Sequence, residues 1–136
     1  MPKSLFTVLV LLSSLISARA LALAKDDSAL IRAIHDDRGV NYIEAGQMVV
    51  EEILPDDNQG LPHQKWLVRL SDNSSVELVY NSDMGDRVPL QVGEVMSAGG
   101  QLIMAQQGPL LHWLHSDPKQ HRPDGYVYVN GTYYGK

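Results

Sequence analysis

Three of the five histidines of this 136-residue chain lie within ten residues, from His112 to His121, with Trp113 between them. Imidazole and carboxylate groups bind divalent transition metals such as zinc, and imidazoles also transfer protons in catalysis. One interpretation is therefore a Zn-like metal site made by four side chains: His112, His115, Asp117 and His121. The other is a strand-to-loop corner that hydrogen bonds stabilise. The spacing matches no established metal motif, so the sequence leaves both open.

The backbone around the cluster decides whether these side chains can meet. On a continuous strand His112 and His115 would point to opposite faces, because side chains alternate along a strand. They converge only if the strand ends or bends near Leu114, and Pro118 favours such an end because it cannot continue a ladder. His63, which precedes the strand predicted at residues 65–70, could be a fourth member of the cluster. The candidate catalytic residues are His63, His112, His115 and Asp117.

The remaining pattern predicts the elements that would position this cluster. Residues 26–28 are typical of a helix start, and Gly39 ends the short helix. Asn130-Gly131 is a typical hairpin turn between two aromatic strands. Other strands are expected at 40–54 with a bend at Gly46, 65–70, 76–80, 95–104 and 110–114. The pattern predicts a mainly β fold, a small antiparallel β-barrel of the OB kind with one short N-terminal α-helix. An SH3-like or other small barrel is the alternative.

The first 24 residues resemble a cleaved signal peptide. Lys3 precedes an apolar stretch at residues 5–16, and small residues allow a cut after Ala20 or Ala24. Arg19 interrupts the apolar run before it is long enough to span a membrane. The chain contains no cysteine, which excludes a lipid-modified cysteine. We therefore expect a periplasmic or secreted protein with one domain at residues 25–136 and no membrane span.

The charge restricts the partners of that domain. The formal net charge is −5, and removing the two basic residues of the signal leaves nine basic against 16 acidic residues, a net charge of −7. Nucleic-acid binding depends on lysine and arginine neutralising phosphates, so a nucleic-acid partner is not expected. A small polar ligand or an envelope protein suits this charge better.

Several short motifs together resemble a known bacterial family. They are Leu54-Pro55-Asp56-Asp57-Asn58-Gln59-Gly60, His63-Gln64, Asn81-Ser82-Asp83, Gly93-Glu94, His112-Trp113-Leu114-His115-Ser116-Asp117-Pro118, Gly125-Tyr126, Asn130-Gly131 and Tyr134. In combination they are similar to the domain of unknown function 3465 family. The resemblance implies a small exported protein with an OB-like barrel, of unassigned role. The resemblance also marks six residues as positions of the family's motifs: His63, Asn81, Asp83, His112, His115 and Asp117.

Three functions follow as hypotheses. The first is a binding or interaction module, in which Asn81, Asp83 and Trp113 contact the ligand. The second is a metal-dependent hydrolase, acting on a phosphoester, whose metal activates a water molecule. The third is a structural envelope protein. The binding module is the function that we favour, because no complete metal motif is present.

Overall fold

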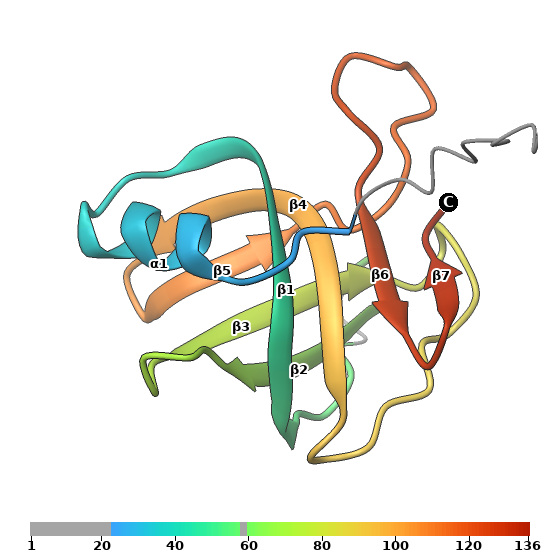
Figure 1. Cartoon of the computed structure of the whole chain (residues 1–136). Helices are drawn as coiled ribbons and strands as arrows, with labels where there is room; N and C mark the ends of the chain where they lie inside the picture. Colours follow the sequence, from blue (N-terminus) through green and yellow to red (C-terminus); the bar gives the residue numbers. More distant parts are fainter. Residues whose placement is uncertain (1–22, 58–59) are drawn as a thin grey trace, which may run out of the picture.

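The computed structural model describes residues 23–57 and 60–136, so most of the predicted signal peptide lies outside the described residues. Figure 1 shows a short helix beside a strongly curved sheet. The elements are α1 Ser28–His35, β1 Val40–Ile53, β2 His63–Arg69, β3 Ser75–Asn81, β4 Val95–Ala105, β5 Gly108–His112, β6 Tyr126–Val129 and β7 Thr132–Tyr134. The predicted helix and final hairpin are therefore confirmed. None of the helices among the described residues is long and apolar enough to span a membrane.

The first five strands form a closed barrel. Their order is β1-β2-β3-β5-β4, and β1 pairs with β4 to close the ring. Strands β6 and β7 extend the sheet from β4. The predicted small, mainly β barrel is confirmed, but it is mixed rather than wholly antiparallel, because β3 and β5 run parallel. An odd number of strands that alternate in direction cannot close into a ring without one parallel pair.

Strand β1 is long because it pairs along both of its edges. Residues 49–53 pair with β2, and residues 40–49 pair with β4. The register with β4 shifts between Ala45 and Met48, and Gln47 between them has a φ of 59°. This irregularity lies at the bend predicted for Gly46. A β-bulge of this kind increases the local twist and lets one strand serve two sides of a barrel.

The barrel interior follows from strand alternation. On β2 the buried side chains are Gln64, Trp66 and Val68, while their neighbours point outward. Trp66 is fully buried, and its indole nitrogen lies 3.1 Å from the sulfur of Met96. Helix α1 packs its buried face against β1. The outward-facing side chains of β2, β3 and β5 are consequently free of the core and can form a site.

Candidate functional site

Five of the residues singled out in the sequence meet at one place on the outer face of β2, β3 and β5. They border a hollow of about 200 Å³, which we call the histidine hollow. Its lining residues are Leu61, His63, Val79, Asn81, His112, Trp113 and His115. Three motifs that are far apart in the sequence therefore converge. Among the described residues the lining groups are imidazole, amide, indole and aliphatic, and the Asp57 carboxylate lies beside the hollow, with Oδ2 4.0 Å from Nδ1 of His63.

Strand register explains this convergence. His63 is paired with Asn81 across β2 and β3, and both side chains point away from the core. On the parallel pair, Leu78 lies beside Leu111, and both are fully buried. The following residues, Val79 and His112, must then point outward together, because side chains alternate along each strand.

The end of β5 brings His115 to the same hollow. The strand ends at His112, two residues earlier than predicted, and Trp113 has a φ of 59°. This left-handed conformation breaks the alternation that would have placed His112 and His115 on opposite faces. His115 is only 5% exposed, whereas His112 is half-buried. The ends of β2, β3 and β5 and the corner after β5 therefore position the three imidazoles.

Each of the two corner imidazoles has one ring nitrogen engaged by the protein. The Nε2 atom of His112 lies 2.9 Å from Oε1 of Gln101, and Nδ1 of His115 donates to the carbonyl of Ser116 at 2.7 Å. Among the described residues no hydrogen bond to the second nitrogen of either ring is found. Burial lowers the pKa of His112, and electrostatic interactions with Arg122, His115 and His63 lower it further. His112 is therefore neutral at neutral pH, with one donor and one acceptor nitrogen.

Trp113 carries two stacked neighbours. The ring of His115 lies 5.1 Å from the Trp113 ring, tilted by 31°, and the guanidinium carbon of Arg122 lies 4.2 Å from the indole centroid. The indole Nε1 and the Arg122 Nη1 are both buried and have no hydrogen-bond partner within residues 23–57 and 60–136. A buried donor without a hydrogen-bond partner lowers the stability of the fold by about 1–3 kcal/mol. Two such donors on residues that touch each other therefore need an explanation.

Asp117, His121 and Asp83 do not line the histidine hollow. Asp117 holds the corner instead, because its two carboxylate oxygens accept the backbone N–H groups of Lys119 and His121, each at 2.9 Å. These bonds lower the pKa of Asp117. Asp83 is exposed, and its backbone N–H is bound by the side chain of Asn81.

The metal role predicted for His112, His115, Asp117 and His121 finds no geometric support. In the described part of the chain, no three His, Cys, Asp or Glu side chains are placed to hold a metal ion together. The Asp117 carboxylate is occupied by backbone donors, and His121 is exposed. The interpretation as a hydrogen-bonded corner therefore fits Asp117 and His121. His112 and His115 still line a hollow that could bind a ligand.

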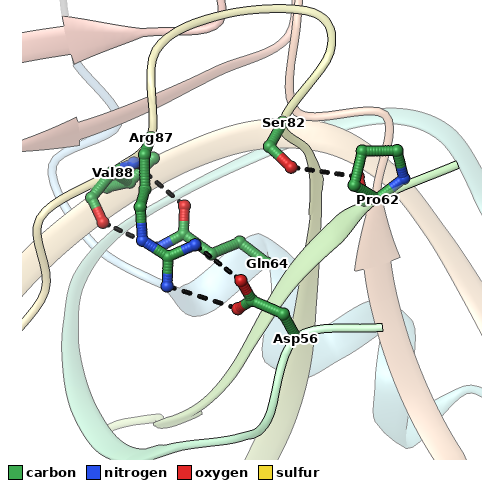
Figure 2. Close-up of polar contacts among 6 residues, drawn as sticks. All are labelled: Asp56, Pro62, Gln64, Ser82, Arg87 and Val88. Carbon is green, nitrogen blue, oxygen red and sulfur yellow. Dashed lines mark hydrogen bonds and ion pairs between the residues drawn. The ribbon is translucent and has the colours of Figure 1, made fainter. Parts of the chain in front are cut away.

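Other motif residues support the frame around the hollow (Figure 2). Gln64 points into the protein, where its amide donates to the carbonyl of Val88 at 2.6 Å and accepts the Val88 N–H at 2.9 Å. Arg87 binds the Asp56 carboxylate with two nitrogens, at 2.7 and 3.3 Å. The Ser82 hydroxyl donates to the carbonyl of Pro62 at 3.1 Å, beside His63.

In two other hollows several of the polar side chains are paired within the protein. The larger, of about 780 Å³, lies beside residues 86–94, where Gln64 and Val88 bind each other and Asn130 donates to Glu94. In the second, Tyr126 donates to Glu44 at 2.9 Å. Burial and the Glu44 charge raise the pKa of Tyr42 there to about 12. The tyrosines of the final hairpin pack across strands, with the Tyr128 and Tyr133 rings 4.7 Å apart.

Sequence reasoning missed three contributors to the site. Val79 and Leu61 are ordinary aliphatic residues, and only the β2–β3 register places Val79 beside His63 and Asn81. Alternation on residues 76–80 could have identified Val79 as outward-facing. Arg122 had no sequence signal, because its stacking on Trp113 depends on the path of the 113–125 loop.

Comparison with known families agrees with the resemblance found in the sequence. The chain belongs to the family described as "Protein of unknown function (DUF3465)", whose model matches residues 9–135. No curated protein and no solved structure matches the chain. The family assignment therefore covers the whole barrel and the histidine hollow, and it attaches no activity to them.

Proposed function

We propose that this protein is exported to the periplasm or secreted, and that it acts there as a binding module through the histidine hollow. The observation that carries the proposal is the convergence of His63, His112 and His115 on one outward-facing hollow. The other motif residues described above are engaged in hydrogen bonds within the fold. The three imidazoles also have contacts within the protein: His112 with Gln101, His115 with the Ser116 carbonyl and His63 with Asp57. They differ from those residues because they border an outward-facing hollow that a ligand can enter.

The groups around the hollow suit a small polar ligand. The neutral imidazole of His112 and the Asn81 amide offer both donors and acceptors, and the Trp113 indole offers an apolar surface. A hollow of about 200 Å³ is smaller than most sites for drug-sized molecules. It fits one group of a ligand, such as a single unit of an oligosaccharide or one side chain of an envelope protein.

The position on the barrel also supports binding. OB barrels commonly bind oligonucleotides or oligosaccharides on the face of strands 2 and 3, and the histidine hollow lies partly on that face. This support is an analogy between folds. The acidic charge of the chain favours oligosaccharides over nucleic acids among these ligands.

A metal-dependent hydrolase is a weaker proposal for the same residues. Its metal would need three or more ligands around one point, and the described residues offer no such group. The described lining of the histidine hollow contains no carboxylate, and Asp57 beside it is placed against His63 rather than against the three imidazoles together. We therefore retain the binding module.

Thermal unfolding in the presence of defined solutes tests the proposal. The solutes are neutral monosaccharides, D-glucuronate, acetate, phosphate and short peptides, and the variants are His63→Ala and the control His35→Ala. His35 is exposed on α1, outside the hollow. A solute that binds the folded state raises the melting temperature with its concentration.

We expect at least one solute to stabilise the wild type and His35→Ala, and to stabilise His63→Ala clearly less. Equal stabilisation of all three proteins would place binding elsewhere, for example beside residues 86–94. The absence of any stabilising solute in the panel would also count against the binding module.

A further inference from the structure

We infer that an oxyanion, a carboxylate or phosphate group, binds at the wall of the histidine hollow through the Trp113 indole N–H and through the guanidinium of Arg122, which stacks on Trp113 without itself lining the hollow. The inference rests on the proposed binding function and names the chemical class of the ligand. It is carried by two buried donors that have no hydrogen-bond partner among the described residues, Trp113 Nε1 and Arg122 Nη1.

The two donors lie on residues that are in direct contact. The guanidinium carbon of Arg122 lies 4.2 Å from the Trp113 ring centroid, so Nη1 and the indole nitrogen belong to one small region. Both groups can only donate hydrogen bonds. Their complement is therefore an acceptor, and a guanidinium favours an acceptor with negative charge because charge-assisted hydrogen bonds are about twice as strong as neutral ones.

The surroundings leave the positive charge of Arg122 available. None of the ion pairs found among the described residues involves Arg122. Asp117 is close enough for the two charges to interact, but its oxygens accept the backbone N–H groups of Lys119 and His121. The chain as a whole is acidic, so a locally positive site is the place where an anion can approach it.

Entry of the anion requires a small movement of the 113–125 loop. Both donor nitrogens are shielded from solvent in the structure. The middle of this loop, residues 118–121, is exposed, and the two hydrogen bonds to Asp117 restrain its movement. The indole lines the hollow itself, so this movement changes the surroundings of the Trp113 ring. Its fluorescence should therefore report binding.

A matched set of sugars tests the inference. Tryptophan fluorescence is recorded while the full chain is titrated with D-glucose, D-glucuronate, glucose 6-phosphate or D-glucosamine, with sodium chloride as the salt control. The other tryptophan, Trp66, is fully buried in the barrel and serves as a constant background. The variants are Arg122→Gln and Arg122→Lys. The control is Lys119→Gln, which removes one positive charge from an exposed position on the same loop.

We expect D-glucuronate or glucose 6-phosphate to give a saturable change, and to bind at least about tenfold more tightly than D-glucose. Arg122→Gln should lose this difference, Arg122→Lys should keep part of it, and Lys119→Gln should keep all of it. Comparing the affinities for D-glucuronate and glucose 6-phosphate shows whether the site prefers a carboxylate or a phosphate.

Three results would overturn the inference. The first is a response shared with sodium chloride, and the second is anion binding that Arg122→Gln leaves unchanged. The third is binding of D-glucose or D-glucosamine without binding of either anion, which would refute the oxyanion and leave the proposed binding function intact. Failure of every sugar here and every solute in the thermal panel would instead refute the binding function itself.

Discussion

Replacing Gln64 with alanine should destabilise the barrel far more than replacing its neighbour His63. Gln64 is 3% exposed, and its amide makes two hydrogen bonds to the backbone of Val88, which is itself 1% exposed. Truncation leaves the Val88 N–H and carbonyl buried without partners, at a cost of about 1–3 kcal/mol each. Partial relaxation of the 86–94 loop reduces the total, and we expect a loss of about 2–4 kcal/mol in the free energy of unfolding.

Urea unfolding and thermal melts measure this loss directly. For a domain of this size the loss corresponds to a fall of roughly 8–16 °C in melting temperature. His63→Ala serves as the matched control, and it should change stability by less than about 1 kcal/mol because its side chain is partly exposed.

The variant Gln64→Glu separates the two bonds. Its carboxylate can accept the Val88 N–H but cannot donate to the Val88 carbonyl until it is protonated. Burial and that carbonyl raise its pKa in the folded state, so its stability is greatest at acid pH and falls as pH rises through the raised pKa. Equal stability of Gln64→Ala and wild type would refute the structural role of Gln64, and so would a Gln64→Glu variant that becomes more stable as pH rises.

Three further predictions concern the corner after β5. Gly125→Ala should destabilise by about 1–3 kcal/mol in urea unfolding, because an added Cβ would lie 2.2 Å from the Trp113 carbonyl oxygen. The wild-type melting temperature should fall below about pH 6.5, and His112→Gln should reduce that fall. Folding lowers the pKa of His112, so the unfolded chain takes up a proton there before the folded protein does. The stability is therefore highest above the unfolded-state pKa and is lost as pH falls through the folded-state pKa. Asp117→Ala should speed hydrogen exchange at the amides of Lys119 and His121, and Asp117→Asn should do so less.

Each of these has a contrary outcome. A Gly125→Ala protein as stable as wild type would mean that the corner has room for a side chain. The same acid sensitivity in wild type and His112→Gln would assign the titration to another group. Unchanged exchange in Asp117→Ala would show that its carboxylate does not hold the corner.

The sequence predicted the fold well because its signals are local. The Asn130-Gly131 turn, the bend near Gly46 and the alternation along 76–80 each depend on a few neighbouring residues, and all were found in the structure. The parallel pairing of β3 with β5 was not predicted, because it follows from closing five strands into a ring.

The site was harder to predict, because it depends on where strands end. The sequence identified His63, Asn81, His112, Trp113 and His115, but it also grouped Asp117 and His121 with them as metal ligands. Spacing alone cannot distinguish a carboxylate that faces a ligand from one that accepts backbone N–H groups within its own turn. The positive φ of Trp113, which brings His115 to the hollow, has no signature in residue type.

The central claim is that three histidines from separate motifs form one binding site. The most direct measurement is NMR of the imidazole side chains of the full chain, titrated with the solutes of the thermal panel. We predict that a binding solute shifts the signals of His63, His112 and His115 together and leaves His35 unchanged. Binding that leaves the three signals in place, or shifts only one of them, would contradict the claim.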